Sequence, residues 1–174
     1  MIEVRQLTAS EGRQSLGALA DVLVDCVEGG ASVSFMAPFP KSDAEKFFEK
    51  ILFEVETGGR ILVAAFDGSK LVGTVQVVTA LPPNQPHRGE IAKLLVLRSA
   101  RGQGVATLLM QRAEECARRC NKALLVLDTV TGGDAERLYQ RLGWTKAGVI
   151  PNYALYPDGR FCDTTIFWKH LSDK

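Results

Sequence analysis

The first part of the chain alternates between strand-like and helix-like patterns of hydrophobic residues. Apolar and polar side chains roughly alternate over residues 2–7, which predicts a first β-strand. Apolar residues then recur at helical spacing over 16–27, which predicts an amphipathic helix. A second helix is predicted to begin at Ser42, because Ser42 and Glu45 have the spacing of a capping box. Glycine and proline interrupt the intervening segment 29–40, so we expect a loop there.

The rest of the chain consists of short β-rich runs separated by turns and by two further helical patterns. Asp67, Gly68 and Ser69 join two of the β-rich runs and predict a hairpin. The run 123–127 is wholly apolar, so we expect a strand that is buried on both faces. In chain order, these elements are strands 61–66, 71–78 and 91–97, a helix over 105–120, strand 123–127, a helix over 135–142, and strands 144–154 and 162–170.

The order of these elements predicts an α/β fold with a single mixed central β-sheet flanked by helices. The order is β-α-α-β-β-β-α-β-α-β-β, and the unit over 91–127 is expected to be a right-handed parallel crossover. The chain has 174 residues, 46% hydrophobic and 24% charged, which is typical of a globular domain. No repeat or linker interrupts it, so we expect one domain over 1–174.

Charge and cysteine content argue against several classes of partner. A formal net charge of +1 disfavours nucleic acid held by long-range attraction. The longest strongly apolar run, 61–66, is too short to span a membrane, and the first ten residues lack the apolar core of a secretion signal. The four cysteines form no CxxC pair and no zinc motif, so we expect free thiols, no metal and a reducing, cytoplasmic location.

The most informative stretch joins the strand that ends at residue 97 to the helix that follows. Gly102, Gly104 and Ala106 are small and let a ligand approach the backbone closely. The free N–H groups at the start of the helix, together with its dipole, favour an anion, and Arg101 adds positive charge. A pyrophosphate group is the natural ligand, and either a dinucleotide or coenzyme A would supply it.

The residues of this turn leave three alternatives open. Gly102-x-Gly104 followed by Asp128 loosely resembles a dinucleotide-binding fingerprint, but Thr107 stands where that fingerprint needs a third small residue. Coenzyme A needs the same cradle without this restriction. The third alternative is a glycine-rich turn that binds nothing. A standard P-loop is excluded, because no GxxxxGK[ST] sequence occurs.

The same turn resembles a motif of GNAT-type N-acetyltransferases. Arg101-x-x-Gly104-x-Ala106, between a strand and a helix, resembles the (Q/R)xxGx(G/A) motif, and the segment 138–144 is similar to the family's LYxxxGF helix and turn. The resemblance covers nearly the whole chain and implies a GNAT fold with acetyl-CoA as co-substrate. It implies that the strand end and the turn bind acetyl-CoA through Leu95, Val96, Leu97, Arg101, Gly102, Gln103, Gly104, Val105 and Ala106.

Three further segments resemble one branch of that family, the tabtoxin-resistance acetyltransferases. They are 29–36, 127–129 and 151–160. That branch acetylates a small β-lactam amino acid, so the resemblance implies a small-molecule amine as acceptor, such as an amino-acid-like toxin or antibiotic. Because many relatives pair as dimers, a homodimer is a further expectation.

Three residues are candidates for the chemistry of acetyl transfer. By the resemblance, Tyr139 lies beside the thioester sulfur and protonates the departing thiolate. Asp128, at the end of a predicted strand, either anchors the charged amine of the acceptor or relays its proton. Glu90 is a second carboxylate carried over from the family, or a solvated residue at a strand end. No cysteine is tied to a base by its sequence position, which favours direct attack by the amine in a ternary complex.

The resemblance also implies an acceptor wall built from the 29–36 loop and the 153–160 hairpin. Its candidate residues are Ser34, Phe35, Tyr153 and Arg160, each of which could equally be an ordinary loop residue. Two other functions stay open. Acetylation of a protein or peptide amine would need an open groove in place of two covering loops. A non-catalytic acetyl-CoA-binding module would have no use for the candidate catalytic residues.

Overall fold

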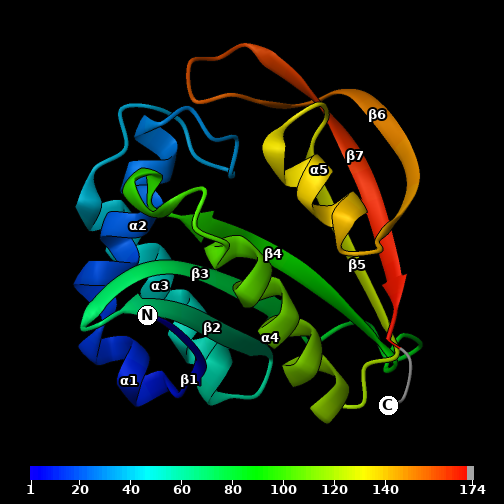
Figure 1. Ribbon diagram of the computed structural model, residues 1–174, viewed down its shortest axis with the longest axis horizontal. Helices are drawn as coiled ribbons and strands as arrows, with labels where there is room; N and C mark the ends of the chain where they lie inside the picture. The colour runs from blue at the N-terminus through cyan, green and yellow to red at the C-terminus, as the bar shows by residue number, and fades with distance from the viewer. Residues whose placement is uncertain (172–174) are drawn as a thin grey trace.

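The computed structural model describes residues 1–171 and contains a mixed seven-stranded β-sheet. The strands are β1 (Ile2–Leu7), β2 (Arg60–Asp67), β3 (Lys70–Val78), β4 (Arg88–Val96), β5 (Leu124–Val130), β6 (Thr145–Leu155) and β7 (Phe161–His170). They lie in the order β1-β2-β3-β4-β5-β7-β6 (Figure 1). Neighbouring strands are antiparallel except β4 and β5, which are parallel. The predicted mixed central sheet is therefore confirmed.

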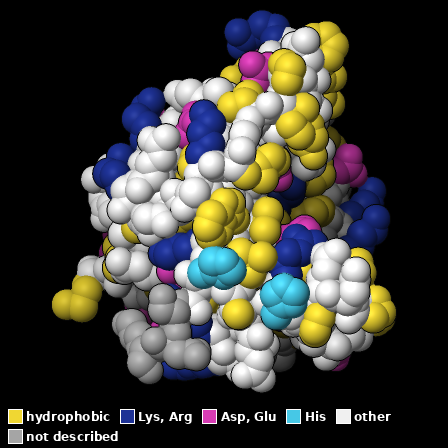
Figure 2. All heavy atoms as spheres, turned by 90° about the vertical axis from the view of Figure 1, so that its right-hand side faces the viewer, with side chains coloured by type: hydrophobic (Ala, Val, Ile, Leu, Met, Phe, Trp, Pro, Cys, Tyr) yellow, Lys and Arg dark blue, Asp and Glu magenta, His cyan; other side chains and the backbone are white. Residues whose placement is uncertain are grey.

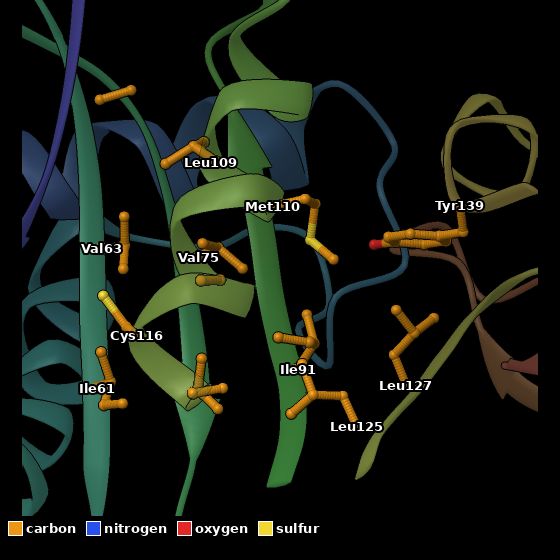
Figure 3. Packing of buried hydrophobic residues seen from close by; sticks show 14 of the residues in the cluster. Ile61, Val63, Val75, Ile91, Leu109, Met110, Cys116, Leu125, Leu127 and Tyr139 are labelled. Carbon is orange, nitrogen blue, oxygen red and sulfur yellow. The ribbon is translucent and has the colours of Figure 1, made fainter. Parts of the chain in front are cut away.

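Helices cover the two faces of the sheet and create two hydrophobic cores. They are α1 (Ala9–Gln14), α2 (Leu16–Glu28), α3 (Lys41–Glu56), α4 (Val105–Arg119) and α5 (Asp134–Arg141). Helices α2 and α3 pack against β1 to β4 on one face, and α4 and α5 lie over the other face (Figure 1). Figure 3 shows the core between α4 and the sheet, where Leu109 and Met110 of α4 lie over the strands. None of the helices within residues 1–171 is long and apolar enough to cross a membrane.

The helices before β2 differ from the prediction in two ways. The short helix α1 precedes α2, so three helices stand between β1 and β2 instead of two. Thr8 and Glu11 form a capping box at its start, each side chain accepting from the backbone N–H of the other residue. The capping box predicted at Ser42 is wrong, because α3 begins one residue earlier with Pro40 at the N-cap position. Ser42 already lies inside the first turn and cannot act as the N-cap.

Strand β5 is not buried on both faces, contrary to the prediction. Leu125 and Leu127 are buried, whereas Leu124 and Val126 are half-buried and Ala123 is exposed. The reason is that the layer formed by α2 and α3 covers only β1 to β4, so that β5 has a helix layer on one face alone.

Strands β4 and β5 are paired at one end only. Residues 88–90 of β4 pair with residues 124–126 of β5, and within the described chain the pairing stops there. Beyond this point the two strands diverge toward their carboxyl ends (Figure 1). The backbone of β4 after Glu90 therefore has no strand partner on the β5 side. Open α/β sheets bind ligands at such an edge.

Candidate active site

Two glycines shape the turn before α4, each with a backbone conformation that other residues rarely adopt. Gly102 and Gly104 have φ angles of 76° and 79°, and Gly104 is the N-cap of α4. A Cβ atom added at either position would meet nothing within 4 Å. Residues 101–104 are exposed, and the first N–H groups of this 15-residue helix have no acceptor within the helix. The turn is therefore an open cradle for an anion, and the pyrophosphate of coenzyme A fits its chemistry.

The side chains of the turn brace it against the end of β4. Arg101 Nε donates to the Val96 carbonyl at 3.3 Å, and Gln103 Nε2 donates to the Ser99 carbonyl at 3.3 Å. Val105 is buried in the α4 core. Arg101 thus links the turn to the end of β4, and its positive charge lies beside the cradle.

Residues at the end of β4 turn their side chains into the two cores. Leu95 is buried beneath α2 and α3, Val96 is buried beneath α4, and Leu97 is half-buried between the two cores. Leu95 and Val96 can therefore meet a ligand only through their backbone groups. Ala106, on the first turn of α4, is half-buried. The contacts of all these residues with acetyl-CoA stay predictions.

A β-bulge interrupts β4 next to its unpaired edge. The register with β3 shifts between Thr74 and Gln76, so that Lys93 and Leu94 of β4 lie opposite a single residue of β3. Lys93 has a φ angle of 52°, in the left-handed region. The bulge bends β4 where β5 no longer pairs with it and places an extra residue outside the ladder.

Lys93 is a candidate site residue that none of the sequence motifs indicated. Its Nζ donates to Ser34 Oγ at 2.7 Å and lies 5.9 Å from the ring centroid of Phe35. Burial lowers the pKa of Lys93, the negative charge of Asp128 opposes that shift, and the positive charge of Arg60 adds to it. The lysine therefore joins the bulge of β4 to the 29–40 loop and responds to the charge of Asp128.

Tyr139 is carried by α5 and is buried. Its ring centroid lies 6.0 Å from those of Trp144 and Phe167, and the residue is 4% exposed. Figure 3 shows the ring extending from α5 with the hydroxyl oxygen toward β4. Burial raises the pKa of Tyr139, and the negative charge of Asp128 raises it further. The hydroxyl therefore keeps its proton at neutral pH and is available as a donor.

Asp128 follows the apolar part of β5 and is exposed. Its Oδ2 accepts a hydrogen bond from Thr164 Oγ1 at 3.2 Å. The carboxylate raises the pKa of both Tyr139 and Lys93, so it lies within electrostatic reach of both groups. The structure thus brings Asp128, Tyr139 and Lys93 together from β5, α5 and β4, where the two strands diverge.

Glu90 stands apart from this group. It lies on the part of β4 that is still paired with β5, and its Oε1 accepts from Arg88 Nη1 at 2.7 Å. Asp128 contributes to the pKa shifts of Tyr139 and Lys93, whereas Glu90 does not. A role for Glu90 as a second catalytic carboxylate stays a prediction, and the ion pair with Arg88 makes it less available as a base.

The two segments of the predicted acceptor wall are hydrogen-bonded to each other in the structure. Ser32 Oγ donates to the Leu155 carbonyl at 2.6 Å, and the Ala37 N–H donates to the Pro157 carbonyl at 3.1 Å. These bonds join the 29–40 loop to the hairpin between β6 and β7, at the top of Figure 1. Ser34 and Phe35 of this loop contact Lys93.

The two wall residues on the hairpin are not brought to Lys93. Arg160 Nε donates to Asp158 Oδ2 at 2.8 Å, and its guanidinium lies 5.3 Å from the Tyr156 ring centroid. Tyr153 is 54% exposed in the irregular part of β6. Contacts of Tyr153 and Arg160 with an acceptor stay predictions.

The cysteines are free thiols, as predicted. Burial raises the pKa of Cys26 and of Cys116, which makes both poor nucleophiles at neutral pH. Within residues 1–171, no group of three His, Cys, Asp or Glu side chains is arranged to hold a metal ion.

Comparison with known proteins identifies relatives with the same arrangement of elements. The model of the acetyltransferase (GNAT) family matches residues 29–144. N-alpha-acetyltransferase 30 of Schizosaccharomyces pombe is 29% identical over 92 residues, which make up 52% of this chain and 61% of that protein. The matched region thus covers less than two thirds of this relative.

Solved structures share the fold over almost the whole chain. YncA of Salmonella typhimurium, provisionally named an acetyltransferase and solved with its cofactor acetyl-CoA, superimposes with a TM-score of 0.79 at 18% identity, covering 99% of this chain and 95% of YncA. A protein provisionally named a phosphinothricin N-acetyltransferase gives a TM-score of 0.81 at 19% identity, covering 99% of this chain and 100% of that one. At these identities the similarity shows a common fold.

Proposed function

The chain belongs to the GNAT family of acetyltransferases, and on that premise we propose that it transfers an acetyl group to the amine of a small molecule. Acetyl-CoA, which GNAT proteins use, supplies the acetyl group as an activated thioester. Residues 101–106 would hold its pyrophosphate at the start of α4, because the cradle there is open and rich in backbone donors.

The proposal is supported most directly by the position of Asp128, which lies on β5 within electrostatic reach of Tyr139, beyond the point where the pairing of β4 and β5 stops. Asp128 holds the charged amine of the acceptor in our proposal, since an exposed carboxylate is a poor base but a good partner for an ammonium group. Tyr139 holds a proton at its hydroxyl for the departing thiolate. Its raised pKa makes donation to a free thiolate cost more than the about 2 kcal/mol expected from reference pKa values, so transfer is concerted with departure of the sulfur.

Direct attack by the amine is favoured over an acetyl-cysteine intermediate. The buried thiols with raised pKa values have no basic side chain to activate them: Cys26 Sγ lies 3.6 Å from the Val96 carbonyl and 3.9 Å from Arg101 Nη2. An arginine does not accept a proton, so Cys26 lacks the general base that nucleophilic catalysis requires.

A small acceptor is favoured because the 29–40 loop is bonded to the β6–β7 hairpin. We propose an amino-acid-like acceptor, in keeping with the resemblance to the tabtoxin-resistance branch. A peptide amine is the second candidate, since the relative from Schizosaccharomyces pombe is named an N-alpha-acetyltransferase. An open groove for a peptide would need the loop and the hairpin to separate. A non-catalytic acetyl-CoA-binding module would not need a proton donor beside Asp128.

A homodimer in the cytoplasm completes the proposal. Apolar side chains gather on the β6–β7 hairpin, where Val149, Ile150, Leu155 and Phe161 are exposed. Figure 2 shows such side chains grouped on the upper part of one face. Strand β6 is also a sheet edge, which a second copy could cover. Free thiols are stable in the reducing cytoplasm. Size-exclusion chromatography with light scattering tests the dimer: a monomer at micromolar concentration would contradict it.

The proposed function is tested by incubating the protein with acetyl-CoA and separate pools of small amines and short peptides. We expect release of coenzyme A thiol and an acetylated product from the small-amine pool. Product from the peptide pool alone would favour the second candidate, and binding of acetyl-CoA without turnover in either pool would favour the non-catalytic module.

A further inference from the structure

The site contains a half-buried positive charge without a carboxylate partner. Within residues 1–171, Lys93 Nζ has no Asp or Glu oxygen within 4.0 Å, and its one hydrogen bond goes to the neutral hydroxyl of Ser34. Arg60, the other cation that acts on Lys93, is itself paired: its Nε lies 2.6 Å from Glu54 Oε2. Lys93 therefore differs from Arg60 in keeping its charge unneutralised.

Partial burial removes some of the water around the ammonium group of Lys93, and no carboxylate of residues 1–171 replaces it. The ammonium group has three N–H donors, and only one has a protein acceptor here. A neutral hydroxyl offsets little of the desolvation that burial imposes, which is why burial is the largest cause of the lowered pKa of Lys93. Its other two donors are therefore free to meet an acceptor group that a ligand brings.

A second donor without a partner lies on the neighbouring strand β3. Gln76 is fully buried on β3 and is paired in register with Ala92, the residue before Lys93. Its Oε1 accepts from Arg60 Nη1 at 2.7 Å, but its Nε2 has no hydrogen-bond partner. Buried amide groups without a partner are rare in folded proteins. The region around the bulge thus has more donors than acceptors.

The position of the ammonium group is fixed from two sides. Ser34 holds it through the hydrogen bond, and Phe35 lies beneath it. Phe35 itself packs against Phe39 and Phe47, with ring centroids 4.5 and 5.2 Å away. A side chain held in place in this way loses little freedom when it binds a ligand. Asp128 provides the opposite charge within the same site, since it raises the pKa of Lys93.

We propose that Lys93 binds a carboxylate of the acceptor while Asp128 holds the amine of the same molecule. This inference rests on the proposed function and narrows it to acceptors that carry both groups. Lys93 is then a specificity-determining residue, and Asp128 and Lys93 form the negative and positive ends of the acceptor site. An uncharged amine, or the N-terminus of a peptide with no nearby carboxylate, leaves Lys93 without its partner.

The test compares free L-amino acids with their carboxamides, which keep the amine and lose the carboxylate charge, and includes uncharged simple amines. We expect the wild-type protein to acetylate the preferred amino acid with a kcat/KM at least about tenfold above that of its amide. Lys93→Met should abolish this preference, mainly through the KM of the amino acid, and Lys93→Arg should restore part of it. The amide should be acetylated equally by the wild-type protein and by Lys93→Met.

Matched variants separate this role from a structural one. Ser34→Gly suits the φ angle of 80° at that position and keeps the ammonium group but removes the hydroxyl that holds it, so the preference should fall less than in Lys93→Met. Lys50→Met, an exposed lysine on α3, should change nothing. Lys93→Met should unfold at about the wild-type temperature, since it breaks no ion pair and loses one hydrogen bond to a neutral hydroxyl.

Each other outcome overturns a defined part of the proposal. Equal kcat/KM values for amino acids and amides, or an unchanged preference in Lys93→Met, would overturn the role of Lys93. Acetylation of simple amines but of no amino acid would overturn it as well, while leaving the proposed function intact. Acetylation of no amine in the panel, although acetyl-CoA binds, would overturn the small-amine function and this inference together.

Discussion

Replacing Tyr139 with phenylalanine removes one oxygen atom and leaves the packing of the ring in place. The ring contacts with Trp144 and Phe167 persist in Tyr139→Phe, because both depend on ring atoms. The hydroxyl has no hydrogen-bond partner within residues 1–171, so its loss should change the free energy of unfolding by less than about 1 kcal/mol. For a chain of this size, that corresponds to a change in Tm of at most about 4 °C.

Activity should respond much more strongly than stability. A positioned general acid contributes about a hundredfold or more to a reaction rate, so kcat should fall by about that factor in Tyr139→Phe. The KM values for acetyl-CoA and for the amine should change little, because the hydroxyl acts on the departing sulfur. Thiol release from acetyl-CoA, followed with a colorimetric thiol reagent, measures kcat, and thermal unfolding measures stability on the same samples.

Tyr156→Phe is the matched control for loss of a tyrosine hydroxyl, since Tyr156 lies on the hairpin and donates no proton in the proposed chemistry. Its kcat should equal that of the wild-type protein, and only the KM of the amine could change, because the hairpin is part of the predicted acceptor wall. A wild-type kcat in Tyr139→Phe would refute the assignment of the acid. A lower kcat together with a fall in Tm well beyond 4 °C would indicate a structural role instead, because the loss of stability would then exceed the expected limit of about 1 kcal/mol.

Three further predictions concern the carboxylate, the turn and the response to alkali. Asp128→Asn should raise the KM of the amine if Asp128 anchors it, and should lower kcat instead if Asp128 relays a proton. Steady-state kinetics equal to those of the wild-type protein would exclude both roles. Gly104→Ala should cost about 1 kcal/mol of stability and raise the KM of acetyl-CoA, whereas Gly68→Ala in the β2–β3 hairpin, also at positive φ, should cost the same and leave that KM unchanged. The folded-state pKa of Tyr139 is raised, so its contribution to stability is complete below the pKa of an unfolded tyrosine, about 10, and is lost as pH rises above it. Thermal unfolding between neutral and alkaline pH should therefore show a smaller alkaline loss in Tyr139→Phe than in the wild-type protein, and equal losses would contradict the buried state of this hydroxyl.

The sequence predicts best the elements that local patterns determine. Alternating and helical periodicities place the strands and the long helices, and the glycines at 102 and 104 indicate the turn because their φ angles of 76° and 79° require glycine. Patterns are less reliable where tertiary structure decides. The apolar run 123–127 indicates a doubly buried strand, but the helix layer over one of its faces ends at β4. At Ser42, the proline that precedes α3 shifts the start of the helix by one residue.

The residues of the candidate site likewise divide into those that local motifs indicate and those that only the tertiary structure reveals. Tyr139 and Asp128 are identified from motifs, and the structure brings them together. Lys93 lies in no motif, and its only signal is that it is a lone lysine in an apolar run. Its importance follows from a bulge, from a loop about sixty residues away in sequence and from the charge of Asp128, which are long-range features. The ion pair between Arg88 and Glu90 is local by contrast, since residues two apart in a strand share a face.

The central claim is that this protein acetylates a small amine by means of Asp128 and Tyr139. The most direct test is mass spectrometry of a mixed panel of small amines and short peptides after incubation with isotopically labelled acetyl-CoA, with wild-type protein and with Asp128→Asn and Tyr139→Phe. Our account predicts a labelled N-acetyl product with wild-type protein and strongly reduced initial rates of its formation with each variant. Labelled peptides without any labelled small amine, or equal initial rates with all three proteins, would contradict it.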